Sequence, residues 1–306
     1  MRAVRHGWAL VLAGGDGGRL RELTRTIAGA PIPKQYCRIT GDRSLLEMTL
    51  ARVGRLAPPQ RTVAIVNQDH LPLATAQLAD LPADNVVVQP RNRDTGPGIL
   101  LSLLALVRRA PRARVAVFPS DHWVADDAAF VAHVERAFRV LDRLPDKLVL
   151  LGVRPDRPEP GYGYLEPGAP LDPPGGDPAF HVRAFREKPS ATLAAEIWRR
   201  GGVWNSFVMV FRAARVLELL ARERPEEFAC LRGMWTDRGA LERAYESLAP
   251  WNFSGGFLAR IPGHLVALRV DDVAWSDWGT PQAIERTLVA LGRPLPWQSC
   301  KPPAAA

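Results

Sequence analysis

The sequence contains little cysteine and no long apolar run, and each shortage excludes a class of protein. Its three cysteines, Cys37, Cys230 and Cys300, are odd in number and far apart. They therefore form neither a disulfide framework nor a zinc site. Cys37 is either a reactive thiol or a buried, inert one.

No run of about 18 apolar residues occurs, so the sequence predicts no membrane span. The first seven residues carry positive charge, but no separate apolar segment or cleavage site follows them before Gly14. This pattern is not that of a signal peptide, so we expect a cytoplasmic protein.

Lysine is also scarce, since only four of the forty basic residues are lysine: Lys34, Lys147, Lys188 and Lys301. The net charge of +8 leaves nucleic-acid binding open as an alternative. The arginines are spread along the chain, however, and no basic block is longer than two residues. We therefore expect no nucleic-acid partner and attribute the arginine excess to compositional bias.

Short apolar runs alternate with helical patterns over the first half of the 306 residues. The expected strands are 8–13, 62–66, 85–89, 114–118 and 148–151. The expected helices are 45–53, 99–109 and 126–141, the second preceded by Gly96-Pro97-Gly98 and the third capped by Asp126 and Asp127. This alternation predicts an α/β fold with a doubly wound, mostly parallel, Rossmann-like sheet.

Residues 154–178 are rich in proline and glycine, which predicts a loop-rich lobe. Regular patterns return after it, and the tail beyond residue 293 is rich in proline and alanine. The strands expected there are 180–186, 203–211 and 265–270. The helices expected there are 191–200, 213–221, 225–234, 241–248 and 281–291.

The first strand ends in a glycine-rich loop, Gly14-Gly15-Asp16-Gly17-Gly18-Arg19-Leu20. Such a loop exposes backbone N–H groups to phosphate oxygens, and a guanidinium fork at Arg19 suits the same ligand. A plain turn is the alternative. The loop matches neither a Walker sequence nor the register of Gly-x-Gly-x-x-Gly, which disfavours a nicotinamide cofactor.

A carboxylate, Asp121, follows the strand 114–118. At the carboxyl end of a strand it is placed to bind a divalent cation, although a helix cap is an equal alternative. We expect the neighbouring His122 to be a structural residue, rather than a transition-metal ligand or a general base.

The glycine-rich loop, followed by Pro33-Lys34-Gln35-Tyr36, resembles the signature of the sugar-1-phosphate nucleotidyltransferases. The Pro-Lys-Gln-aromatic form is most similar to the mannose-1-phosphate guanylyltransferase branch. Five further segments resemble that family in the same order, so that the likeness extends from residue 8 to about 283. These segments are 89–98, 118–122, 185–189, 204–206 and 275–280.

The resemblance implies roles for individual residues. It implies nucleotide contacts for Gly14, Gly15, Gly17, Gly18, Gln89, Arg93, Thr95 and Gly96. It implies sugar contacts for Gly163, Glu187 and Asn205, and catalytic roles for Arg19, Lys34, Asp121 and Lys188. It also implies a Mg²⁺ ion held by Asp121 and Asp277 as cofactor.

The implied reaction is transfer of a guanylyl group from GTP to mannose 1-phosphate, by in-line attack without a covalent intermediate. The partners are then a nucleoside triphosphate and a sugar 1-phosphate, and a homodimer is left open. Phe207 stands where the family usually has glycine, so sugar identity is open too. The alternatives are glucose 1-phosphate with dTTP or UTP, and a catalytically silent paralogue that binds sugar nucleotides.

The resemblance also suggests how the chain is divided. We expect a catalytic domain over residues 1–283, with a nucleotide half up to about residue 152 and a sugar half after it. Residues 284–306 would add a C-terminal helix and tail.

Overall fold

A computed structural model describes residues 7–171, 178–234 and 237–298. Over these residues nine strands form one mixed sheet, in the order β3-β2-β1-β4-β9-β6-β10-β8-β7, and β5 pairs separately with β11. The strands are β1 (Gly7–Leu12), β2 (Thr62–Asn67), β3 (Val86–Gln89), β4 (Arg114–Pro119), β5 (Trp123–Val124), β6 (Leu148–Val153), β7 (Gly163–Leu171), β8 (Ala179–Glu187), β9 (Val203–Arg212), β10 (Leu265–Val270) and β11 (Trp275–Ser276).

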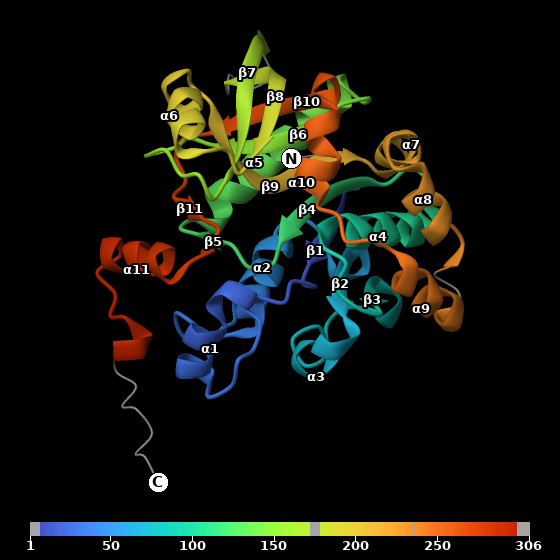
Figure 1. Cartoon of the computed structure of the whole chain (residues 1–306), viewed down its shortest axis with the longest axis horizontal. Coiled ribbons are helices and arrows are strands. Elements are labelled where there is room, and N and C mark those ends of the chain that lie inside the picture. The colour runs from blue at the N-terminus through green and yellow to red at the C-terminus, as the bar shows by residue number, and fades with distance from the viewer. Residues whose placement is uncertain (1–6, 172–177, 235–236, 299–306) are drawn as a thin grey trace.

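Helices cover both faces of the sheet, as the predicted doubly wound α/β fold requires (Figure 1). They are α1 (Arg21–Ala28), α2 (Leu45–Val53), α3 (Leu71–Ala74), α4 (Thr95–Arg109), α5 (Asp127–Arg143), α6 (Ala191–Arg199), α7 (Ala213–Glu223), α8 (Pro225–Leu231), α9 (Arg238–Ser247), α10 (Phe253–Gly256) and α11 (Pro281–Ala290). No helix in the described ranges combines the length and apolar character needed to cross a membrane.

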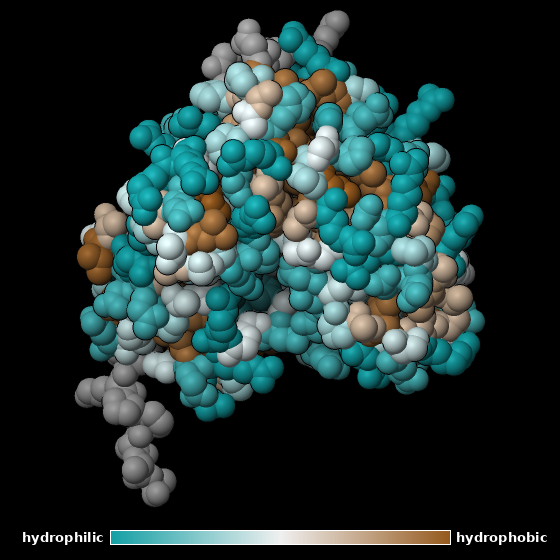
Figure 2. Space-filling view, turned by 45° about the horizontal axis from the view of Figure 1, so that its top comes forward, coloured by the Kyte–Doolittle hydropathy of each residue, from teal (hydrophilic) through white to brown (hydrophobic). Residues whose placement is uncertain are grey.

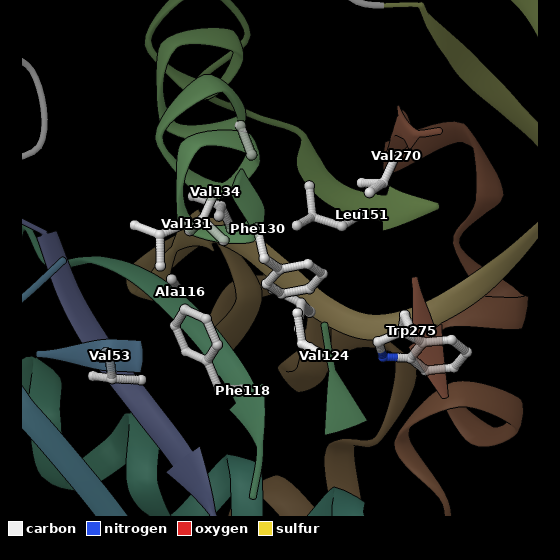
Figure 3. Packing of buried hydrophobic residues seen from close by; sticks show 14 of the residues in the cluster. Val53, Ala116, Phe118, Val124, Phe130, Val131, Val134, Leu151, Val270 and Trp275 are labelled. Atoms are coloured by element: carbon white, nitrogen blue, oxygen red, sulfur yellow. The ribbon is translucent and has the colours of Figure 1, made fainter. Parts of the chain in front are cut away.

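Alternate side chains of the strands enter two separate apolar layers, because successive residues of a strand point to opposite faces. Val11 of β1 belongs to the apolar layer that also contains residues of α2 and α5, whereas its neighbour Leu10 belongs to the layer that contains residues of α4 and α7. Figure 3 shows the first layer, in which Phe130 of α5 lies beside Phe118 of β4. Both phenylalanines are almost fully buried, so this layer fixes α5 over the centre of the sheet.

Strands β3, β2, β1 and β4 are parallel, as predicted. Their carboxyl ends therefore meet at one edge of the sheet. The glycine-rich loop follows β1, the 89–98 segment follows β3, and the Asp121 segment follows β4. Three of the sequence motifs are thus brought together by the parallel arrangement alone.

The sheet is more mixed beyond β4. The expected fifth strand, β6, does not lie beside β4, because β9 is inserted between them and runs antiparallel to both. Strand β6 pairs in parallel with β10, and β8 and β7 continue antiparallel. Hydrophobic runs locate buried strands but carry no information about the direction of their partners, which explains the difference.

The prediction of a loop-rich lobe over residues 154–178 is wrong in its centre, where β7 forms. Tyr164 and Leu165 are fully buried there, and they drive the strand against β8 and β9. Pro167 and Pro170 are tolerated because the pairing with β8 shifts register around them. Residues 172–177 lie outside the described residues.

Two helices begin close to where the sequence places them. Asp126 caps α5 by accepting N–H bonds from Ala128 and Ala129, at 2.8 and 3.0 Å. Helix α4 starts at Thr95, four residues before the predicted start. Pro97 lies in its first turn, where N–H groups have no partner within the helix, so the proline costs no hydrogen bond.

The C-terminal helix is confirmed as α11, and the predicted tail lies outside the described residues from residue 299 onward. The proposed division into two halves stays a prediction, although one sheet runs through both of them.

Candidate active site

A cavity of about 520 Å³ opens at the carboxyl ends of the parallel strands. Figure 2 shows this part of the surface hollowed near its centre, with hydrophilic residues around the hollow. Its lining includes most of the residues that the sequence singled out. They are Gly14, Gly15, Arg19, Gln89, Thr95, Asp121, Gly163, Glu187, Lys188, Asn205 and Asp277.

Lys34 joins two acidic segments that are far apart in the chain. Its ammonium lies 3.2 Å from Oδ2 of Asp121 and donates to the backbone carbonyls of Asp277 and Trp278, the latter at 3.1 Å. The lysine is 6% exposed and lies behind the cavity wall formed by the two aspartates. The predicted convergence of Asp121, Asp277 and Lys34 is therefore present.

The charge of Lys34 determines how its neighbours titrate. Burial acts to raise the pKa of Asp121, but the charge of Lys34 and its hydrogen bond to the carboxylate outweigh this effect, and the pKa falls below its ordinary value. Burial lowers the pKa of His122, and Lys34 lowers it further against the opposing effect of Asp121. Asp121 is therefore ionised at neutral pH and His122 is uncharged.

His122 lines the cavity and packs against an aromatic side chain, and its structural role stays a prediction. Its ring stands edge-on to Trp275, with centroids 5.2 Å apart. Its Nε2 atom is 3.6 Å from Oδ1 of Asp121, which is beyond hydrogen-bond distance.

The two aspartates fit a hard divalent cation, since carboxylate oxygens are what Mg²⁺ prefers. Oδ1 of Asp277 accepts a hydrogen bond from the N–H of Gly279 at 2.8 Å, which fixes the orientation of that carboxylate. Oδ2 is the oxygen that would face a cation. No cluster of three or more His, Cys, Asp or Glu side chains suited to a metal occurs among the described residues. A cation held here needs phosphate or water oxygens to complete its shell.

The opposite end of the cavity is formed by β7, β8 and β9. A Cβ atom placed on Gly163 would lie 2.9 Å from Oε2 of Glu187 and 3.5 Å from Cβ of Asn205. The three predicted sugar-binding residues are thus close together. Burial raises the pKa of Glu187, against the opposing effect of Lys188.

Phe207 lines this end of the cavity and has a φ of 61°, a left-handed conformation that favours glycine. Its backbone N–H donates to Oδ1 of Asn205 at 3.1 Å. The side-chain oxygen of Asn205 is thereby engaged, and its N–H₂ group remains available to a ligand. The Phe207 ring packs edge-on to Phe253, with centroids 6.3 Å apart.

Arg93 and Gly96 do not line the cavity as the described residues define it. Arg93 donates to the carbonyls of Tyr245 and Glu246 at the end of α9, at 2.8 and 3.1 Å. A Cβ on Gly96 would lie 2.2 Å from Cε3 of Trp251, so only glycine lets that indole approach. Both residues hold the 245–253 segment against the start of α4.

Thr95 both lines the cavity and helps to hold the 245–253 segment, because its hydroxyl accepts a hydrogen bond from the N–H of Phe253 at 2.9 Å.

In the glycine-rich loop, Gly17 and Gly18 are not among the described residues that line the cavity, whereas Arg19 is exposed at its rim. A Cβ on Gly279 would be 3.1 Å from the Arg19 guanidinium. Arg19 therefore lies next to the Asp277 segment.

Several residues of the lining were not predicted from the sequence, among them Asp16, Asn92, Asp94 and Asn252. Asn92 donates to Oδ2 of Asp16 at 2.8 Å, and Asn252 donates to Oδ1 of Asp94 at 3.2 Å. Asp16 and Asn92 stand inside recognised motifs, and their polarity was the available signal. Asn252 follows α9 in a segment with no motif, so only the structure reveals it.

Comparison with known proteins shows the family to which the chain belongs. The model of a family described as "Nucleotidyl transferase" matches residues 8–291. Mannose-1-phosphate guanylyltransferase of Escherichia coli (strain K12) is 35% identical over 233 residues, which cover 74% of this chain and 47% of that protein. Mannose-1-phosphate guanylyltransferase ManC of Salmonella typhimurium is 31% identical over 285 residues, with coverages of 89% and 58%. The chain thus spans about half the length of these curated relatives.

One solved structure is similar to this chain in fold and in sequence. The crystal structure of a protein from Thermus thermophilus, described as a mannose-1-phosphate geranyltransferase, superposes with a TM-score of 0.80 at 31% identity. The match covers 92% of this chain and 79% of that one.

Proposed function

Because the chain belongs to the nucleotidyl transferase family, we propose that it transfers a guanylyl group from GTP to mannose 1-phosphate, forming GDP-mannose and pyrophosphate. The observation that carries the proposal is the meeting of Asp121, Asp277 and Lys34 at one end of a cavity. Glu187 and Asn205 lie at its other end. The first end supports a role in binding the triphosphate, and the second supports a role in binding the sugar.

In the proposed reaction an oxygen of the sugar phosphate attacks the α-phosphorus of the nucleotide. The bond from that phosphorus to the bridging oxygen breaks, and pyrophosphate leaves with the electron pair. The attacking phosphate oxygen is already deprotonated, so no side chain needs to act as a base.

Each charged residue then has a task. Arg19 at the rim binds the triphosphate, and Lys188 binds the sugar phosphate. Asp121 and Asp277 would hold a divalent cation, for which we propose Mg²⁺; when bound, such a cation would neutralise negative charge on the α-phosphate. Lys34 keeps the two aspartate segments together, and its charge lies just behind them.

The remaining recognition is by groups of the glycine-rich loop and by three further side chains. Glycine-loop N–H groups face the phosphates, and Gln89 faces the base. Glu187 accepts hydrogen bonds from sugar hydroxyls and Asn205 donates to them.

Pyrophosphate release over a grid of nucleoside triphosphates and sugar 1-phosphates tests the proposal. We expect the highest kcat/KM with GTP and mannose 1-phosphate. A higher value for glucose 1-phosphate with dTTP or UTP would replace the substrate pair but keep the chemistry. Tight binding of GDP-mannose without turnover on any pair would favour a silent, regulatory paralogue. The cytoplasmic location stays a prediction.

A further inference from the structure

Ser254 is a buried serine whose hydroxyl the rest of the protein does not use. Among the described residues the buried serines are Ser44, Ser102, Ser120, Ser206, Ser254 and Ser276. The hydroxyls of all the others form hydrogen bonds within the protein. The Ser254 hydroxyl forms none with any residue that the structure describes. Because buried polar groups are almost always paired, this exception needs an explanation.

The hydroxyl of Ser254 is open to the cavity. The residue is only 3% exposed, yet it lines the cavity. Its oxygen is not enclosed by the protein, in contrast to Nε1 of the nearby Trp251, which is buried without a partner. A ligand in the cavity can therefore reach this oxygen.

The neighbours of Ser254 in the chain place it at the sugar end of the cavity, where Glu187 lies. Phe253, just before it, packs edge-on to Phe207, with ring centroids 6.3 Å apart. A Cβ atom on Gly255, just after it, would lie 3.7 Å from both Cβ and Cγ of Glu187. Ser254 thus lies between contacts to two residues that line the sugar end.

The turn that carries Ser254 is fixed without help from the hydroxyl. Oδ1 of Asn252 accepts hydrogen bonds from the N–H groups of Ser254 and Gly255, at 2.9 and 3.1 Å. The N–H of Phe253 donates to the hydroxyl of Thr95 at 2.9 Å. Removal of the Ser254 hydroxyl leaves all three bonds in place, so the turn should keep its position.

We propose that Ser254 is a specificity-determining residue whose hydroxyl binds a ring hydroxyl of the sugar 1-phosphate. The inference rests on the proposed function to the extent that a sugar occupies this end of the cavity. An ionised Glu187 can only accept hydrogen bonds, and the N–H₂ group of Asn205 can only donate them. A serine hydroxyl does both, so it pairs with a sugar hydroxyl in either direction.

The contact discriminates because the Ser254 oxygen is buried. A sugar that lacks the contacted hydroxyl leaves this oxygen covered and without a partner. A site built to bind a substrate hydroxyl rejects the analogue that lacks it for this reason. The site should therefore select sugars that carry a hydroxyl on the side of Ser254.

Ser254→Ala isolates this effect, because it removes a single oxygen that no other residue uses. Ser102→Ala is the matched control. Ser102 is also buried, and its hydroxyl donates to the carbonyl of Gly98 at 2.8 Å. It is not among the described residues that line the cavity. The control thus removes a buried hydroxyl that serves the fold alone.

The first measurement compares the dissociation constants of GDP-mannose and GDP by calorimetry, for the wild type and both variants. The two ligands share the nucleotide, and only GDP-mannose carries the sugar. We expect Ser254→Ala to weaken the binding of GDP-mannose about tenfold and to leave that of GDP unchanged. Ser102→Ala should leave the ratio of the two constants unchanged.

The second measurement identifies the contacted hydroxyl from kcat/KM with GTP and the 2-, 3-, 4- and 6-deoxy analogues of mannose 1-phosphate. Ser254→Ala should lower kcat/KM with mannose 1-phosphate about tenfold. With one analogue alone, the wild type and Ser254→Ala should be equal, because the hydroxyl that Ser254 binds is already missing. With 2′-deoxy-GTP or 3′-deoxy-GTP in place of GTP, the full effect of Ser254→Ala should remain.

The inference is overturned if Ser254→Ala binds GDP-mannose as tightly as the wild type does, or if it weakens GDP equally. It is also overturned if the effect disappears with a deoxynucleotide, since Ser254 would then contact the ribose. A wild type that binds GDP-mannose but turns over no sugar 1-phosphate refutes the proposed reaction, while the comparison with GDP still tests Ser254. Preference for another substrate pair replaces mannose, and the same measurements then use that sugar.

Discussion

At the scale of single residues, backbone strain in this protein is concentrated at the cavity. Among the described residues, four that are not glycine have a positive φ: Asp94, Lys188, Phe207 and Trp278. The first three line the cavity, and the fourth follows Asp277. Each such conformation costs on the order of 1–3 kcal/mol. At Asp94, Lys188 and Phe207 it accompanies a place in the cavity lining, whereas Trp278 is fully buried in the core.

Phe207 offers a direct test of this strain. Phe207→Ala and Phe207→Gly both remove the ring that lines the sugar end, but only glycine relieves the left-handed backbone. We expect both variants to accept sugar 1-phosphates with a bulkier substituent, such as an N-acetyl group at C2, with kcat/KM raised about tenfold relative to mannose 1-phosphate. Phe207→Gly should be more stable than Phe207→Ala by about 1 kcal/mol in urea unfolding. Equal stabilities would show that φ carries no strain.

Lys34 is expected to be essential for turnover. Lys34→Ala removes the charge that holds the Asp121 and Asp277 segments together, so kcat should fall on the order of 10²–10³-fold. Lys147→Ala is the control, since Lys147 also donates to a backbone carbonyl, that of Gly263, at 2.6 Å, but on an exposed surface. Steady-state pyrophosphate release measures both. Retained activity in Lys34→Ala contradicts the assignment.

The structure decides between a reactive and a buried, inert thiol at Cys37. It is 1% exposed, and burial raises the pKa of its thiol to about 11. At pH 8 only about one molecule in a thousand carries the reactive thiolate. We expect iodoacetamide to leave Cys37 unmodified at pH 8 in the folded protein and to modify it in urea, as measured by peptide mass spectrometry.

At the scale of elements, a buried ion pair attaches α2 to the start of α5. Nε of Arg52 lies 2.6 Å from Oδ1 of Asp127, and the arginine side chain is 2% exposed. Burial acts to lower the pKa of Arg52, and Asp127 opposes the effect. The arginine keeps its charge because the carboxylate is there.

Asp127→Ala leaves that guanidinium buried without its partner, so we expect a loss of about 3–5 kcal/mol in the free energy of unfolding. The double variant Arg52→Leu with Asp127→Ala removes the unpaired charge and should recover most of the loss. Urea denaturation of the single and double variants measures the difference. A double variant as unstable as Asp127→Ala would refute this account.

The elements also show how far sequence reasoning extends. Helix α2 and strands β2 and β10 lie almost where hydrophobic spacing predicts them, because the order of apolar residues within each segment determines which of its side chains are buried. Strand β7 was missed because two buried residues, Tyr164 and Leu165, outweigh the prolines near them. Local propensity cannot show such a tertiary effect.

The same contrast holds for the site. Asp121 and Asp277 were expected to meet because motif resemblance carries three-dimensional information that spacing does not. Arg93 and Gly96 belong to a motif of the same kind, yet they hold the 245–253 segment. That segment has no motif of its own, so its place at the cavity was not predictable.

At the scale of the whole molecule, we expect ligand binding to stabilise the fold only when a divalent cation is present. GTP with Mg²⁺ at a hundred times its Kd should add about 2.7 kcal/mol to the free energy of unfolding. EDTA, or the change of both Asp121 and Asp277 to asparagine, should remove most of that gain. Thermal unfolding measures the shift, and an equal shift in EDTA would exclude a role for the cation.

The position of β9 has a consequence for how the chain is made. Strand β9 hydrogen-bonds to β4 on one side and to β6 on the other, although both precede it in the chain. During synthesis, the backbone N–H and C=O groups on one edge of β4 and one edge of β6 therefore have no strand partner until residues 203–212 have left the ribosome. A polypeptide that stops before them would expose two unpaired strand edges, which favour aggregation, so we expect that the first 152 residues do not fold as an independent module.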